Sequence, residues 1–248
     1  MKQLEMLGFE LRADEAHEQV IDPEDTDTEL FFEVAEALLD KATPAVQTEV
    51  IPELESYKGR WHPLGFMVYP LGVHPEIGSL RLHIWPITFR ETIAGGSGIH
   101  NHAWNIASRV VAGEYTDARF QIDETTTLPA DKTLPANWLR VFMPKKVAGE
   151  PDCLSSDGTI VSVRNEGEVR VSAGWNHRLV PEEFHLPTIP LTRLASTLVL
   201  DSPSFGYPPS ILIGGTRGPE SFHNARPIIS VVEARAAKEQ ILASQDSY

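Results

Sequence analysis

The texture of the chain between residues 65 and 212 constrains the fold most strongly. Short runs of β-branched and aromatic residues alternate there with Gly, Pro, Asn and Asp, which is typical of an all-β sandwich or barrel. The Thr-, Asp- and Pro-rich segment Asp123–Pro135 is expected to be a loop. We expect strands over Gly65–Tyr69, Leu80–Trp85, Ala107–Val111, Glu114–Gln121, Leu139–Met143, Thr159–Val163, Glu168–Ser172, His177–Pro181 and Ser196–Asp201.

Helical patterns flank this region on both sides. Apolar residues recur every three or four positions from residue 29 to 39, which predicts an amphipathic helix capped near Asp27 or Thr28. A second helix is expected to start with Pro44 in its first turn and to end near Tyr57. The tail Ile228–Ser244 predicts a helix that packs on the sheet or on a second subunit.

These patterns predict one domain with additions at both ends. Residues 1–64 are expected to form a helical extension, residues 65–212 the β-barrel, and residues 213–248 a loop and helix. A chain of 248 residues that is 42% hydrophobic and 23% charged is large enough to bury a sizeable core.

Charge and composition exclude several classes of partner. The chain has 21 Lys and Arg against 35 Asp and Glu, and its net charge of -14 repels phosphate backbones and anionic membrane surfaces. No run approaches the ~20 apolar residues that a bilayer span needs, and the N-terminus lacks the features of a signal peptide. We therefore expect a cytoplasmic protein that binds neither nucleic acid nor membranes.

The cysteine count limits the kind of metal site. Cys153 is the only cysteine, so the chain has no internal disulfide and no thiolate zinc site. Any metal must be held by histidine and carboxylate side chains.

One histidine pair stands out among the nine histidines. In an extended strand, residues two apart point to the same face, so His100 and His102 can converge on one ion. The glycine-rich run 95–98 before them favours a sharp turn at the mouth of the site. The pair predicts two metal ligands.

Two later glycines indicate where a third ligand would lie. Gly113 stands where a strand is expected to turn and start back, and Gly174 is expected to turn the chain so that His177 begins a strand. We predict His177 as the third ligand, and His185 is the alternative.

These residues resemble the two motifs of the cupin superfamily. Gly95 or Gly96, His100, His102 and Gly113 match the first motif, and Gly174 with His177 matches the second, in which Ser172 replaces the usual proline. The resemblance covers roughly residues 65–203. It implies a double-stranded β-helix, or jelly-roll barrel, that holds a divalent metal at its mouth on His100, His102 and His177.

The chain departs from most metal cupins at one ligand. Their glutamate would fall at Ile106 or Ala107, and neither can coordinate a metal. The remaining three-histidine site is similar to that of the cysteine dioxygenase and thiol dioxygenase branch. Three neutral imidazoles leave the metal charge uncompensated, which suits Fe(II) that binds an anionic substrate together with dioxygen.

The residues that anchor substrate in that branch are absent. Its arginine would fall near Met67, and its Ser, His and Tyr would fall at Thr197, Val199 and Asp201. The resemblance therefore implies the metal site and not the substrate. Four arginines are candidate anchors, with ordinary salt bridging as the alternative role: Arg81, Arg90, Arg109 and Arg178.

Several other side chains are candidates for the substrate pocket. His83 lies on the strand face that it shares with Arg81 and Trp85, and this face is either the barrel interior or the surface. Trp85, Trp104 and Trp175 form either an aromatic wall that excludes water or part of the barrel core. The predicted pocket residues are Arg81, His83, Trp85, Trp104, Tyr115 and His185.

The predicted function is that of a non-heme Fe(II) dioxygenase that oxidises a small thiol or other chelating molecule with dioxygen. One alternative is a redox-silent isomerase or lyase that uses Zn, Mn or Ni, and another is a non-enzymatic ligand-binding cupin. The resemblance also suggests a homodimer.

Overall fold

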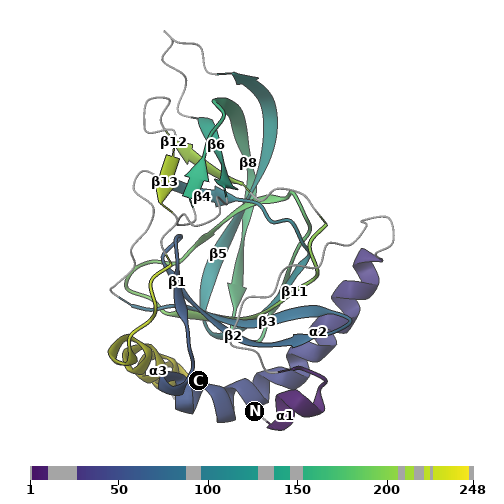
Figure 1. Ribbon diagram of the computed structural model, residues 1–248, viewed down its shortest axis with the longest axis vertical. Helices are drawn as coiled ribbons and strands as arrows, with labels where there is room; N and C mark the ends of the chain where they lie inside the picture. The colour runs from purple at the N-terminus through teal and green to yellow at the C-terminus, as the bar shows by residue number, and fades with distance from the viewer. Residues whose placement is uncertain are drawn as a thin grey trace.

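The structure is a computed structural model that describes residues 2–10, 27–87, 96–127, 137–145, 153–205, 210–214, 221–223 and 226–245. As predicted, the fold is mainly antiparallel β-sheet, with helices contributed by both ends of the chain (Figure 1). The helices lie together along the sheet formed by β1, β2, β3 and β11, and the strands β4, β6, β8, β12 and β13 lie at the opposite end of the molecule.

The bounds of the elements are as follows. The helical segments are α1 (Lys2–Met6), α2 (Thr28–Ala45), the π-helical turn η2 (Val46–Val50), the 3-10 segment η3 (Ile51–Ser56) and α3 (Val231–Gln245). The strands are β1 (Arg60–His62), β2 (Phe66–His74), β3 (Gly78–Trp85), β4 (Gly96–His100), β5 (Ile106–Thr127), β6 (Trp138–Lys145), β7 (Cys153–Ser155), β8 (Thr159–Ser172), β9 (Asn176–Leu179), β10 (Phe184–Thr188), β11 (Ala195–Asp201), β12 (Ile211–Gly214) and β13 (Ser221–His223).

The strand pairings form two connected sheets around one interior. In the first sheet the order is β1-β2-β3-β11-β5-β9, so the late strand β11 lies between β3 and β5. In the second, the pairings β5-β10, β10-β4, β4-β12, β12-β6, β6-β8 and β8-β5 close a ring. A closed ring of this kind leaves no free edge along those pairings.

Strand β5 belongs to both sheets, and this differs from the prediction. We expected a reversal at Gly113 between two short strands, but β5 runs without a break from Ile106 to Thr127. Gly113 has φ +72 and lies beside an irregularity in the β5-β11 register. The glycine therefore bends the strand from one sheet into the other, because a left-handed residue there redirects the backbone without ending the ladder.

Two further predictions about the strands need correction. The two segments expected over residues 159–163 and 168–172 form the single strand β8, and residues 123–127 of the expected loop belong to β5. The remainder of that loop, residues 128–135, lies outside the described residues.

The N-terminal helix begins as predicted but does not end as predicted. The Asp27 side chain caps α2 by accepting a hydrogen bond of 3.0 Å from the Leu30 amide. We expected Pro44 to open a second helix, but it lies inside α2, which continues directly into η2 and η3. The wider π-helical turn follows Pro44 at once, where the proline removes one donor from the regular helical ladder.

The C-terminal helix packs on its own chain. Lys238 of α3 lies 2.7 Å from a carboxylate oxygen of Glu55, and α3 also contacts β5. Of the two predicted positions for this helix, the structure shows the intramolecular one.

The largest hydrophobic core lies outside the barrel, between the first sheet and the helices. It takes Leu80, Leu82 and Ile84 from β3, and it takes Phe32 and Leu39 from α2. Because side chains alternate along a strand, the residues between them on β3 face the barrel interior. The faces of the first sheet are therefore both buried, one against helices and one around the interior.

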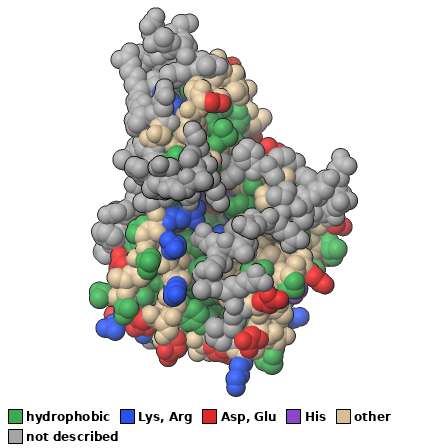
Figure 2. Space-filling view, in the orientation of Figure 1, with side chains coloured by type: hydrophobic (Ala, Val, Ile, Leu, Met, Phe, Trp, Pro, Cys, Tyr) green, Lys and Arg blue, Asp and Glu red, His purple; other side chains and the backbone are tan. Residues whose placement is uncertain are grey.

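Acidic and basic side chains are interspersed over the helices and the first sheet on the face shown in Figure 2. Among the described residues, no helix combines the length and the apolar character needed to cross a bilayer.

The two motif glycines provide a test of the strand geometry. A Cβ at Gly113 would lie 2.0 Å from the Leu194 carbonyl oxygen, whereas a Cβ at Gly174, also left-handed with φ +84, would meet no atom within 4 Å. We expect Gly174→Ala to lower the free energy of unfolding by about 1–2 kcal/mol through backbone strain alone. Gly113→Ala should cost at least about 2 kcal/mol more because of the clash. Urea denaturation of both variants measures this difference, and equal losses would contradict the close approach of β5 and β11.

Candidate metal centre

Three histidine side chains converge at one end of the second sheet. His100 is the last residue of β4 and pairs directly with His185 of β10, and His102 follows two residues after the strand ends. The ring centroids of His100 and His102 are 4.8 Å apart, and those of His100 and His185 are 4.4 Å apart. One ring nitrogen from each histidine lies within 4.8 Å of the other two, so the group could hold a metal ion.

Local hydrogen bonds hold the segment between the first two histidines. The backbone N–H of the buried Asn101 donates to the Ser210 carbonyl oxygen at 3.0 Å. The Asn101 side-chain Oδ1 accepts from the Ser210 backbone N–H at 2.6 Å. The carbonyl oxygen of His102 accepts a hydrogen bond from Glu182, a non-glycine residue with φ 64. A left-handed residue of this kind is costly, and such strain persists where surrounding contacts require it.

Two of the three rings have a fixed orientation. His100 Nδ1 donates to the Gly98 carbonyl oxygen at 2.8 Å, and His185 Nδ1 donates to Asp117 Oδ1 at 2.8 Å. With Nδ1 carrying the proton, the lone pair of a neutral ring is on Nε2. This pairing of a ligand histidine with a carboxylate or carbonyl is the usual support of metal sites.

The nitrogen positions fit a metal ion. His102 Nε2 lies 3.1 Å from His185 Nε2, a distance at which the two nitrogens either share a proton or bind one ion. Two nitrogens that are each about 2.1 Å from one ion, at an angle near 90°, are separated by about this distance. Imidazole donors suit zinc, iron, nickel and copper, so the donor set does not select one metal.

Two of the rings, those of His100 and His102, lie where protonation is disfavoured. Burial, followed by the nearby His185, lowers the pKa of His100 to about 3. Burial also holds the pKa of His102 well below its usual 6.5, with further contributions from His100, His185, His62 and His83. These two rings are therefore neutral at pH 7, which is the state that binds metals.

A buried carboxylate lies immediately behind the cluster. Asp117 of β5 is fully buried, and besides His185 it contacts His177 Nε2 at 3.1 Å and Arg119 Nε at 3.1 Å. Burial alone would raise the pKa of Asp117, but hydrogen bonds from His177 and His185 outweigh it and hold this pKa below its ordinary value. Arg119 in turn pairs with Glu183, so the carboxylate belongs to a chain of charges that compensate one another.

The structure groups the alternative third ligand, and not the favoured one, with His100 and His102. His177 is not part of the three-histidine group, because its Nε2 is engaged by Asp117 and lies 3.1 Å from Arg119 Nη2. His185, the alternative, takes its place. As expected, Gly174 precedes β9 and His177 lies near the start of that strand. However, β9 pairs with the first half of β5, whereas β10, which carries His185, pairs with the second half.

There is an identifiable reason why the sequence did not favour His185. Strand β10, which carries His185, was not predicted, because its sequence Phe-His-Leu-Pro-Thr contains a proline and is only five residues long. Asp117 was also missed. Its signal was present, since an acidic residue alternates with Tyr115 and Arg119 along a strand that was otherwise correctly expected.

The predicted pocket residues lie mostly around the same interior. The Trp104 ring is 5.8 Å from His102, and the Tyr115 ring is 5.9 Å from His177 and 6.3 Å from Trp85. The His83 ring lies 5.0 Å from the Phe66 ring and 6.0 Å from the Trp85 ring, measured between ring centroids.

Other candidates have structural roles. Trp175 is 61% exposed, so it is not part of an aromatic wall. Arg109 pairs with Asp40, and Arg178 pairs with Glu36 and lies over the Phe32 ring, which supports ordinary salt bridging for both. Arg81 pairs with Asp201 at 3.3 Å. Arg90 lies outside the described residues.

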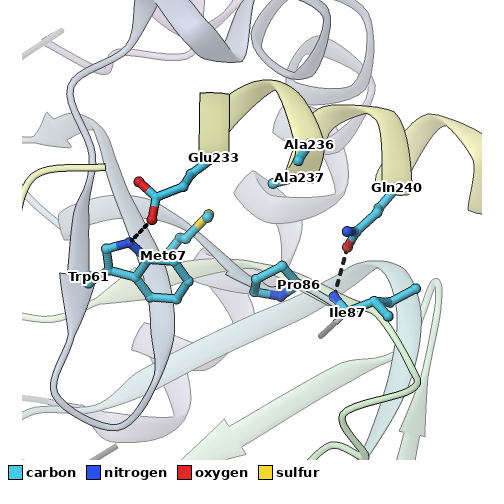
Figure 3. A pocket seen from close by; sticks show the side chains of 8 residues that line it. All are labelled: Trp61, Met67, Pro86, Ile87, Glu233, Ala236, Ala237 and Gln240. Carbon is cyan, nitrogen blue, oxygen red and sulfur yellow. Dashed lines mark hydrogen bonds between the residues drawn. The ribbon is translucent and has the colours of Figure 1, made fainter. Parts of the chain in front are cut away.

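A separate pocket lies on the outer side of the first sheet. It has a volume of about 310 Å³ and is bounded by α3 and by residues of β1 and β2, as Figure 3 shows. Its polar groups are already engaged, because Glu233 accepts from Trp61 Nε1 and Gln240 accepts from the Ile87 amide. This pocket contains none of the three histidines, so we place the candidate site in the barrel.

Comparisons with known proteins give little further guidance. No family model matches the chain, and no curated protein is significantly similar to it. Among solved structures, the chain is similar to L-ribose isomerase from Cellulomonas parahominis with L-ribose, at 16% identity and a TM-score of 0.32, over 89% of this chain and 96% of that one. At these values the likeness identifies neither a substrate nor a reaction.

The barrel and the three-histidine cluster nevertheless fit the cupin superfamily that the sequence motifs suggested. The closer resemblance to the thiol dioxygenase branch stays a prediction.

The exchange of His177 for His185 can be tested directly. We expect His185→Ala to lose stoichiometric divalent metal, because one of three donors is removed, and His177→Ala to retain it. Elemental analysis after loading with Zn(II), Mn(II) or Fe(II) and gel filtration measures both. Metal loss in His177→Ala with retention in His185→Ala would restore the original assignment.

The support given by Asp117 can be tested with a matched acid. We expect Asp117→Asn to weaken metal binding about 10- to 100-fold, since His185 loses its charged acceptor. Asp201→Asn is the control, because Asp201 is equally buried in the first sheet but pairs with Arg81. Competition with a fluorescent chelator gives both affinities, and equal weakening in the two variants would argue against a specific role for Asp117.

Proposed function

We propose that this protein is a divalent-metal-dependent enzyme that binds a small oxygen-bearing substrate at His100, His102 and His185 and transforms it by Lewis-acid chemistry, as an isomerase or lyase. The observation that carries the proposal is the convergence of three ring nitrogens, two of them 3.1 Å apart. Two ring nitrogens at that separation either share one proton in an N–H···N hydrogen bond or bind one cation, and the third histidine beside them favours the cation. A bound divalent ion would polarise a substrate carbonyl or hydroxyl group.

The character of the barrel interior supports this chemistry over oxygen activation. The inward faces of the first sheet carry polar side chains, among them Arg81 and His83 on β3, Thr197 on β11, and Ser108 on β5. A redox-silent reaction needs such groups to bind substrate oxygens and carry protons.

Several residues would orient the three ligand histidines. Asp117 orients His185 through its hydrogen bond, and Arg119 and His177 hold Asp117 in place. His100 is oriented by the Gly98 carbonyl oxygen, and Asn101 fixes the backbone between the two first ligands. These contacts would hold the three rings rigidly about a bound ion, which would bind the substrate directly.

A second candidate remains the Fe(II) dioxygenase that the sequence suggested. It is favoured by one observation: within the described residues the metal-binding group contains three histidines and no carboxylate. A site of that kind leaves the charge of the ion to be balanced by an anionic substrate.

One experiment separates the two candidates. The protein is freed of metal with a chelator and reloaded separately with Mn(II), Zn(II), Ni(II), Co(II) or Fe(II). Each form is incubated in D2O with a panel of hydroxy-carbonyl compounds and followed by proton NMR for exchange next to the carbonyl. An oxygen electrode records each form in parallel with thiols and phenols.

We expect metal-dependent exchange that is lost in His185→Ala and is accompanied by no oxygen uptake. Substrate-dependent oxygen uptake with iron alone would instead establish the oxygenase. Failure of the wild-type protein to bind any of the five metals would overturn the metal-dependent proposal altogether.

A further inference from the structure

A second polar feature of the barrel interior lies on β3. His83 Nε2 is inaccessible to solvent and has no hydrogen-bond partner among the described residues. A buried imidazole nitrogen without a partner is costly, so such a group in a native protein calls for an explanation. The position of His83 favours a substrate atom as its partner.

The face of β3 that carries His83 is the one turned toward the metal centre. Its neighbours Leu82 and Ile84 point into the outer core, which places His83 on the opposite, inward side. The Phe66 and Trp85 rings, 4.7 Å apart, flank His83. The influence of a charge on His83 upon the pKa of His102 agrees with a shared interior.

Two arginines near this interior already have acidic partners. Arg81 pairs with Asp201, and Arg119 pairs with Asp117 and Glu183. Each of these two arginines thus has an acidic partner, which disfavours a second anionic group on the ligand. The group that meets His83 is therefore expected to be uncharged.

A hydroxyl group fits these constraints. Because a hydroxyl both donates and accepts, it satisfies His83 Nε2 in either neutral tautomer of the ring. The adjoining aromatic rings offer an apolar surface to the carbon atoms that bear it. We propose that His83 is a substrate-contacting residue that binds a hydroxyl group of a hydroxylated carbon chain, whose other end chelates the metal ion on His100, His102 and His185. This proposal rests on the metal-dependent function proposed above.

The test uses ligands that differ only in the length of the hydroxylated chain. Glycolate, glycerate and threonate share one chelating end, a carboxylate beside a hydroxyl, and each adds one hydroxyl-bearing carbon to the last. They are titrated into the Co(II)-loaded protein, and the visible absorption of Co(II) reports both metal occupancy and ligand binding. The variants are His83→Phe, which removes the polar nitrogen, and His83→Gln, which keeps a terminal amide.

We expect one of the longer ligands to bind the wild-type protein about fivefold to tenfold more tightly than glycolate, as one added hydrogen bond allows. That gain should vanish in His83→Phe and return in part in His83→Gln, while the affinity for glycolate and the Co(II) spectrum stay unchanged. His74→Gln, at the far end of β2, is the control and should retain the full gain.

Two kinds of failure are distinguishable. If Co(II) binds but the longer ligands gain nothing, or if their gain survives in His83→Phe, the hydroxyl subsite is wrong while the metal centre stands. If Co(II) does not bind the wild-type protein, the metal-dependent function is wrong and the subsite falls with it.

Discussion

The arrangement of the site depends on one buried carboxylate. Asp117 has no exposed surface, so its charge must be met by donors within the protein. His185 of β10, His177 of β9 and Arg119 of β5 itself supply them. Three strands are thus tied to one point, and the ring of His185 is left with its other nitrogen directed at His100 and His102. Loss of this carboxylate would affect ring orientation and strand packing together.

The register in which β10 pairs with β5 and with β4 places His185 beside both Asp117 and His100. His185 pairs with Arg119 on one side of β10 and with His100 on the other. Since side chains alternate, a slip of one residue in either pairing would turn His185 to the opposite face of the sheet. Gly113 contributes at a distance, because the bend it allows carries the same strand from the helix-covered sheet into the ring that holds the histidines.

The sequence predicted the parts of this arrangement that rest on local pattern. The β-barrel texture, the Asp27 cap and the closeness of His100 and His102 are all local properties, and each was recovered. The grouping of His185 with His100 and His102 was only the alternative from sequence, because it depends on which strands become neighbours. His177 and His185 are eight residues apart and both lie on short strands that pair with β5, and only the pairing of β10 with β4 decides between them.

The same reasoning explains why the strand faces were ambiguous from sequence. In a simple barrel the interior is the hydrophobic core, so a face that carries Arg81 and His83 would be assigned to the surface. Here the helices α1, α2 and α3 cover the outer side of the first sheet and provide the main core there. The apolar burial that stabilises the fold is therefore obtained largely outside the barrel. Because most of the apolar burial lies outside the barrel, the interior can hold histidines, arginines and acids at positions where an ordinary barrel would need apolar side chains. The residues that stabilise the fold are thus largely different from those that form the site.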